Sequence, residues 1–321
     1  MTLTTEIQKT LTDTVIEAMR SSNGKLPWRK EWDGSWLPRN GHTGRPYMGV
    51  NVFYLQCVAW LNNFESNDWF TFKGATMSNG KVRRGEKASG KVIYWHTGDK
   101  DFVDDKDKLR LTKQKPMWLK YFNVWNKDQI DWECPEEFRC VAPEIKETAP
   151  WYEPCREALD RMRTTGVRIG RGAPAYIVIF DKVTMPLEKA FIGTNAYWAT
   201  MFHELGHATG HKKRLHRFEN GYEVDKGSIY AYEELVAELC SAYLCQMLRI
   251  YDDEYSIDNS ARYLNHWISA MNGDSKYIFK ASRDAQEAVR YILNYPESMD
   301  HRQRVKKGEE DHEKKTSNSE R

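Results

Sequence analysis

The sequence His203-Glu204-Leu205-Gly206-His207 is the most informative stretch of the chain for its fold and its chemistry. Two histidines four residues apart on a helix project from the same face, so both imidazoles can bind one metal ion. A glutamate directly after the first histidine completes the HExxH pattern, which is typical of zinc-dependent hydrolases. The residues from Ala196 to Ala208 contain no proline and one glycine, which predicts a helix, and Thr194-Asn195 offers its N-cap.

A hydrolytic zinc site needs a third protein ligand and one open position for water. A second helix pattern, from Tyr230 to Leu239, carries Glu233, Glu234 and Glu238 beside an apolar face. A carboxylate beside such a face is costly to bury unless it meets a cation, and a metal ion is one. We favour Glu234 as the third ligand and expect Glu238 to accept the free ring N–H of a liganding histidine. Glu233 remains an alternative third ligand. The other interpretation is that all three glutamates are solvent-exposed charges on the helix surface.

Glu204 cannot easily bind the same ion as its neighbour His203, but it can reach the water that a metal would activate, so it is the candidate general base. Zinc is the expected cofactor, and other divalent transition metals fit the same ligands. Stabilising the oxyanion requires a further electrophile. Tyr230, Tyr232 and His211 are near in sequence, and the sequence does not choose among them. For His211 an exposed position in a basic stretch is favoured over a catalytic one.

The chain has 321 residues, of which 40% are hydrophobic, and this length favours two domains. Its six cysteines show neither C-x-x-C pairs nor the regular spacing of a disulfide framework, which favours a reducing cytoplasm. The N-terminal residues lack the basic and apolar regions of a signal peptide, and no apolar run approaches membrane-spanning length. We therefore expect a cytoplasmic protein that has no membrane partner.

The first 132 residues contain nine of the twelve tryptophans. Between Arg20 and Lys127 there are 20 Lys and Arg against 10 Asp and Glu, although the whole chain has a formal charge of only +2. Basic residues among aromatic ones are typical of surfaces that bind single-stranded nucleic acid, where cations contact phosphates and rings stack on bases. Most tryptophans in any domain are core residues, so we expect only roughly two or three of the nine to be exposed and able to stack on bases. The candidates are Arg39, Arg45, Lys73, Arg83, Arg84, Lys87, Trp28, Tyr47, Trp69 and Trp95.

The hydrophobic periodicity predicts an α+β protein. Helices are expected at Thr4–Arg20, Asn51–Asn62 and Pro154–Thr164. Strands are expected at Trp69–Lys73, Lys91–His96, Trp118–Val124 and, fully buried, Tyr176–Phe180. The acidic run 99–107 predicts a solvated loop or hairpin. A polar stretch with prolines, 136–150, predicts a linker between a domain at 1–135 and one at 151–300, and the charged tail 301–321 is predicted to be disordered.

Short motifs in both halves carry a resemblance to a known family. The N-terminal half contains Pro27-Trp28, Thr43-Gly44, Asn51, Thr71-Phe72, Gly85-Glu86-Lys87 and Tyr121-Phe122-Asn123-Val124-Trp125-Asn126. The C-terminal half contains Met185-Pro186, the HExxH motif, Thr209-Gly210-His211, Arg214-Leu215 and Glu233-Glu234-Leu235-Val236-Ala237-Glu238. In this order they resemble the antirestriction protein ArdC family, in which a single-stranded-DNA-binding domain precedes a metallopeptidase domain. Asn51 and Phe72, which belong to the matches, complete the predicted DNA-binding set.

The resemblance implies a small α+β DNA-binding domain followed by a mainly helical, zincin-like metallopeptidase domain with a short sheet. It further implies a protein of a plasmid, phage or other mobile element that protects incoming single-stranded DNA, with a protein of the host restriction machinery as the implied peptidase substrate. The alternative is a DNA-shielding protein whose metal is structural or vestigial. Glu204 favours the enzyme, because a structural zinc needs no base beside an open position. A duplex-specific transcription factor is disfavoured, because the sequence lacks helix-turn-helix and zinc-finger spacing.

Overall fold

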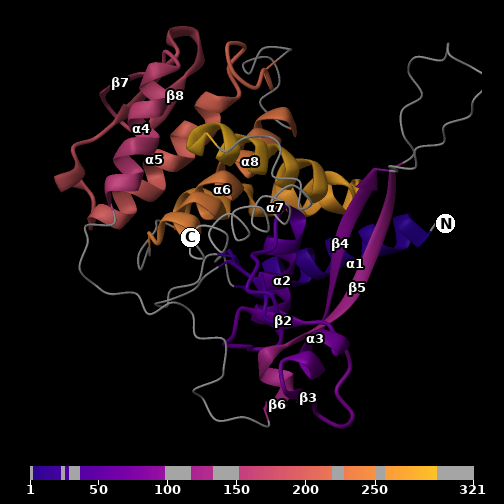
Figure 1. Cartoon of the computed structure of the whole chain (residues 1–321). Helices are drawn as coiled ribbons and strands as arrows, with labels where there is room; N and C mark the ends of the chain where they lie inside the picture. The colour runs from indigo at the N-terminus through magenta and orange to yellow at the C-terminus, as the bar shows by residue number, and fades with distance from the viewer. Residues whose placement is uncertain are drawn as a thin grey trace, which may run out of the picture.

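The structure, a computed structural model, describes residues 3–22, 26–28, 37–97, 117–132, 152–218, 228–250 and 257–294. The acidic run 99–107, the predicted linker 136–150 and the predicted tail 301–321 lie outside the described residues. Figure 1 shows an N-terminal part that ends with β6 (Ile130–Trp132) and a mostly helical part that begins with α4 (Tyr152–Thr164). The predicted α+β class, with a mainly helical second half and short sheets, is confirmed.

The N-terminal part is built around one apolar helix. Helix α2 (Val50–Leu61) is buried over ten consecutive residues, as expected for a helix that is hydrophobic on all sides. Helix α1 (Leu3–Ser21) packs on α2 and buries its predicted apolar stripe. A four-stranded sheet has the order β1 (Arg39–Asn40), β2 (Asp68–Phe70), β5 (Met117–Asn126) and β4 (Gly90–Thr97). The remaining elements of this part are α3 (Phe72–Met77), β3 (Gly80–Val82), the 3-10 helix η1 (Lys127–Gln129) and β6 (Ile130–Trp132).

Most elements predicted for this part are confirmed, with one correction. The helices at α1 and α2 and the strands within β4 and β5 lie where the sequence placed them. The strand predicted for Trp69–Lys73 is wrong in its second half, because it ends at Phe70. The Thr71 hydroxyl accepts a hydrogen bond from the Gly74 N–H and caps α3, so the chain enters a helix there.

The C-terminal part stacks helices beside a three-stranded sheet. The sheet has the order β7 (Arg168–Arg171), β9 (Lys182–Met185) and β8 (Ala175–Ile177), with β7 parallel and β8 antiparallel to β9. Helix α6 packs on α5, α7 and α8, and α4 packs on α8 (Figure 1). The helices are α4 (Tyr152–Thr164), α5 (Thr194–Thr209), α6 (Ser228–Leu248), α7 (Ile257–Gly273) and α8 (Tyr277–Leu293), with the 3-10 turns η3 (Val178–Phe180) and η4 (Glu188–Ala190).

Two predictions for this part are wrong in detail. The apolar run Tyr176–Phe180 is not a fully buried strand, because β8 ends at Ile177 and Ile179 is 74% exposed in the turn that follows. Thr194-Asn195 does not cap α5 either. The helix begins at Thr194 after Gly193, and the Thr194 hydroxyl donates to the Glu188 carboxylate instead.

The two parts share a continuous hydrophobic core. Phe53 of α2 meets the Tyr243 ring of α6 edge-on, with ring centroids 5.0 Å apart. The Tyr243 hydroxyl donates to the Gly49 carbonyl (3.2 Å), and the Gln246 amide donates to the Trp28 carbonyl (3.1 Å). Helix α6, which carries the three predicted glutamates, is therefore packed against both halves of the chain.

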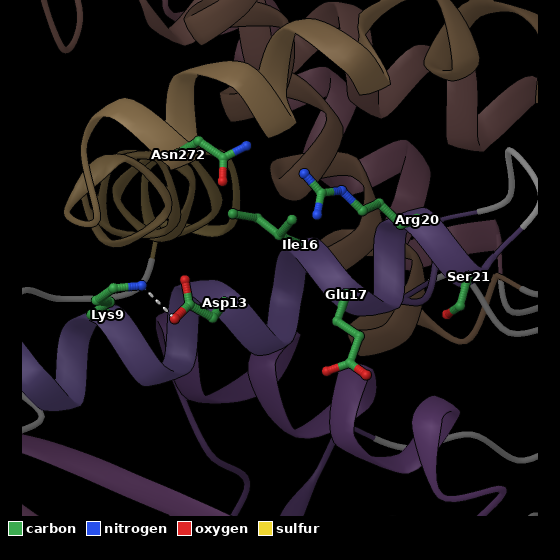
Figure 2. A pocket seen from close by; sticks show the side chains of 7 residues that line it. All are labelled: Lys9, Asp13, Ile16, Glu17, Arg20, Ser21 and Asn272. Carbon is green, nitrogen blue, oxygen red and sulfur yellow. Dashed lines mark hydrogen bonds and ion pairs between the residues drawn. The ribbon is translucent and has the colours of Figure 1, made fainter.

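A surface pocket of about 630 Å³ lies between α1 and α7 (Figure 2). Lys9 and Asp13, which form an ion pair of 2.7 Å, line it together with Glu17 and Arg20. None of the predicted site residues lies there. Among the helices in the described ranges, none is both long and apolar enough to cross a bilayer.

Candidate metal centre and DNA-binding surface

Helices α5 and α6 bring His203, His207 and Glu234 together. The two Nε2 atoms lie 3.1 Å apart, and each is 3.5 Å from an oxygen of the Glu234 carboxylate. One donor atom from each of the three side chains lies within 4.8 Å of the others. Gly206 makes this approach possible, because a Cβ at that position would lie 3.1 Å from the Cα of Ala237 on α6.

The electrostatics of the centre suit a cation. Burial by itself lowers the pKa of His203, but contact with Glu234 and the charges of Glu204 and Glu238 outweigh it and raise that pKa to about 9. Burial also works to raise the pKa of Glu234, yet its contacts with His203 and His207 lower it to about 2. The Glu234 carboxylate is thus ionised in a pocket where it is only 8% exposed.

The other ring nitrogen of each histidine faces a different glutamate. Nδ1 of His203 lies 3.8 Å from Oε2 of Glu238, and Nδ1 of His207 lies 3.7 Å from Oε1 of Glu233. Carboxylates on this side of a metal-binding histidine fix its ring orientation and its tautomer. The sequence predicted such a position for Glu238, whereas it considered Glu233 only as an alternative ligand. The structure places Glu234, not Glu233, beside the two Nε2 atoms.

This donor set fits a divalent transition metal. Two imidazoles and one carboxylate form the ligand set of hydrolytic zinc sites, which leave a further position open. Both imidazoles already present Nε2 to a common point and Nδ1 to a carboxylate. Within the described ranges, one group of three His, Cys, Asp or Glu side chains is arranged so that it could hold a metal ion, and it consists of His203, His207 and Glu234.

Glu204 lies on the same helix, between the two histidines, and is 7% exposed. Of the three residues that the sequence left open for the oxyanion, Tyr230 contacts the centre through a hydrogen bond with Glu234. Tyr232 donates to Asp284 (2.7 Å) instead. His211 accepts a hydrogen bond from the Lys213 N–H, and its Nδ1 lies 3.7 Å from an oxygen of Asp181. It is 7% exposed, so the exposed position predicted for it is wrong.

The predicted DNA-binding residues divide between surface and core. Phe72 is 62% exposed, and the cations on the surface are Arg45, Lys73, Arg83, Arg84 and Lys87. Arg39 is half-buried in an ion pair with Asp68. The side chain of Trp95, in β4, lies outside the described atoms.

Four of the predicted DNA-binding residues are core residues, and for them the prediction of an exposed contact needs correction. Trp28, Tyr47 and Trp69 are at most 3% exposed, so their rings are covered by the protein itself. Asn51 is 6% exposed, and its side-chain amide makes two hydrogen bonds of 2.8 Å to the backbone of Ile93. These side chains serve packing, as most tryptophans do.

The exposed residues cluster around α3. The Phe72 ring meets that of Trp125 edge-on at 5.9 Å, and the Trp125 indole donates to the Glu86 carbonyl (3.5 Å) in the loop that carries the cations. We call this surface the α3 face; it consists of Phe72, Lys73, Arg83, Arg84, Lys87 and Trp125. A second aromatic pair, Tyr94 and Phe122, lies on β4 and β5 with 42% and 47% exposure. The sequence missed this pair, although alternation along the two strands could have indicated it.

Comparison with known proteins agrees with both halves of this description. Residues 5–125 match the family described as the N-terminal domain of anti-restriction factor ArdC, and residues 156–284 match a zincin-like metallopeptidase family. Among curated proteins, protein y4eC of Sinorhizobium fredii is 29% identical over 293 residues, covering 90% of this chain and 92% of its own. The DNA primase TraC of Escherichia coli is 28% identical over 315 residues, but the chain spans only 28% of its length.

The fold and the site define a two-part protein with a zincin-like metallopeptidase domain behind an ArdC-type N-terminal domain. Two crystal structures of the antirestriction ArdC protein from plasmid R388 share this whole arrangement at 31% identity. The metal-free one has a TM-score of 0.68 and covers 90% of this chain and 98% of its own, and the Mn(II)-bound one has a TM-score of 0.67 and covers 92% and 98%. The chain belongs to the ArdC antirestriction protein family.

Proposed function

We propose that this protein binds and protects the incoming single-stranded DNA of a mobile element and carries a working metal-dependent peptidase site. The observation that carries the peptidase half is the convergence of His203, His207 and Glu234, with Glu204 on the same helix. The Mn(II)-bound ArdC structure supports a metal in this fold. Zinc is our choice of ion because of the ligand set, and a protein of the host restriction machinery is our proposed substrate.

In this proposal His203, His207 and Glu234 hold the metal. A bound divalent ion supplies a Lewis acid and makes water a nucleophile near neutral pH. Glu204 takes a proton from the attacking water on a carboxylate oxygen and delivers it to the nitrogen of the leaving amine. Glu238 and Glu233 fix the orientation of the two imidazoles from their Nδ1 sides. Tyr230, through its contact with Glu234, is the side chain placed to donate to the oxyanion.

For the DNA we propose the α3 face, with the separate ring pair Tyr94 and Phe122 as a second stacking site. Its exposed cations suit phosphates, and its exposed rings suit unstacked bases. We propose residues 1–135 as the DNA-binding domain, 151–300 as the peptidase domain and 136–150 as the linker. The cytoplasm is the proposed location, which agrees with Cys57, Cys155, Cys240 and Cys245 being buried free thiols.

A non-proteolytic DNA-shielding protein is the second candidate, and the α3 face favours it because shielding needs no cleavage. Glu204→Gln separates the two functions, since it keeps the shape of the side chain and removes the base. We expect the variant to bind one metal ion like the wild type and to lose cleavage of proteins in host extract. The degree to which a restricting host destroys incoming DNA is then measured in cells that express either the wild type or the variant. Full protection by the variant would assign antirestriction to DNA binding, and undiminished cleavage would refute Glu204 as the base.

A further inference from the structure

Two arginines in the segment after α5 turn back onto the end of that helix. Nε of Arg214 donates to the Ala208 carbonyl (2.6 Å), and Nη2 of Arg217 donates to the Gly206 carbonyl (2.9 Å). Carbonyls in the last turn of a helix lack intrahelical donors, and a cation is favoured beside them. Both arginines therefore cap the helix that carries the two imidazoles.

Of these two arginines, only Arg217 also contacts a side chain that faces a histidine of the metal centre. Its Nε and Nη2 donate to the two carboxylate oxygens of Glu233, at 3.1 and 2.6 Å, and its Nη1 donates to the Thr209 hydroxyl (2.8 Å). Such a two-point contact fixes the plane of a carboxylate as well as its position. The same Glu233 carboxylate lies 3.7 Å from Nδ1 of His207. Arg217 thus sets the orientation of the group that faces this imidazole.

Arg214 has the same place at the helix end and different partners. Its guanidinium pairs with Asp181, just before β9, and Nη2 donates to the Tyr176 hydroxyl (3.0 Å). These contacts join α5 to the small sheet and not to a carboxylate that faces a histidine of the centre. Arg214 is therefore a matched control for Arg217, because it is also an arginine that caps the same helix with its side chain mostly covered, 0% exposed against 11% for Arg217.

We propose that Arg217 is a positioning residue of the metal centre, which acts through Glu233 to aim Nε2 of His207 at the ion. The inference rests on the proposed metal-dependent function. Without the guanidinium, the buried Glu233 carboxylate loses its compensating cation and its fixed plane. The imidazole then loses the partner that sets its orientation, and metal affinity falls.

The test measures zinc affinity in the full-length protein by competition with a chromophoric chelator, and the visible absorption spectrum of bound Co²⁺, which reports the ligand geometry. Arg217→Gln should lower zinc affinity about 10- to 100-fold and change the Co²⁺ spectrum. Arg217→Lys should recover only part of the affinity, because it keeps the charge without the planar fork. Arg214→Gln should lower the melting temperature similarly but change zinc affinity less than about twofold.

A double variant tests the route through Glu233. If Arg217 acts through that carboxylate, Arg217→Gln combined with Glu233→Gln should lose no more zinc affinity than the stronger single variant. Wild-type zinc affinity and an unchanged Co²⁺ spectrum in Arg217→Gln would reduce the residue to a helix cap. An equal loss in Arg214→Gln would also overturn the proposal, since it would show a general effect of the helix end. His203→Ala tests the proposed metal function separately, because its zinc affinity reports the centre whatever the role of Arg217.

Discussion

Replacing Phe72 by alanine should weaken single-stranded DNA binding without unfolding the protein. The ring is 62% exposed and lies outside the core, and its edge contact with Trp125 contributes about 0.5–1.5 kcal/mol to stability at most. A base stacked on such a ring contributes about 1–3 kcal/mol. Since about 1.4 kcal/mol corresponds to a tenfold change in Kd, Phe72→Ala should raise Kd about 5- to 150-fold.

Met77 supplies the matched control for this prediction. It lies on the same short helix, is 58% exposed and is apolar, but it has no ring. Met77→Ala should therefore change Kd less than about twofold, while Phe72→Leu, which keeps apolar bulk, should behave like Phe72→Ala.

The assay is fluorescence anisotropy of a labelled oligonucleotide with the full-length protein at several salt concentrations. Stacking is insensitive to salt, so Phe72→Ala should shift the plot of log Kd against log salt without changing its slope. Lys73→Gln should instead reduce the slope by about 0.7, the value for one phosphate contact on a single strand. Equal affinities of Phe72→Ala and Met77→Ala would refute the α3 face as a stacking surface.

Three further predictions concern the metal centre and the core. Glu234→Ala should lower metal affinity far more than Glu233→Ala in chelator competition, and the reverse order would show that Glu233 is the ligand. Metal affinity should also rise with pH, because a proton held by His203 with a pKa of about 9 competes with the ion, whereas Glu234, with a pKa of about 2, stays ionised. The slope of log affinity against pH should be about one between pH 7 and 9 and should flatten above that, and a flat profile throughout would exclude this competition. Trp69→Ala should lower the free energy of unfolding by about 3–5 kcal/mol in urea titrations, since the side chain is fully buried, and a loss below about 1 kcal/mol would contradict its core position.

The arrangement of the metal centre could be predicted from the sequence because helical periodicity is local. His207 lies four positions after His203, and Glu238 lies four positions after Glu234, so each pair occupies one helix face whatever the rest of the fold does. The choice between Glu233 and Glu234 depends on how α6 is rotated against α5. The two helices approach closely at Gly206 and Ala237, residues far apart in the sequence, and no local pattern encodes that approach.

Composition predicted a surface of aromatic and basic residues but could not tell which rings are exposed. Trp69 packs edge-on against Phe64 in the core and is fully buried. Phe72 is exposed because Thr71 ends the strand and begins α3. A single cap, directly after the buried Phe70, thus separates a core strand from a surface helix.

Helix α6 packs against both halves of the molecule, although it was predicted to belong to the second domain alone. Glu234 lies at the metal centre, and nine residues later Tyr243 packs on Phe53 of α2, about 13 Å along the helix at 1.5 Å per residue. The contact of Gln246 with Gln56 joins residues 190 positions apart, and such pairings leave no periodic trace in a sequence. Cutting the chain between its halves would expose this shared core to water. Measurements of DNA binding and metal binding should therefore be made on the full chain, where each half is packed as the structure describes.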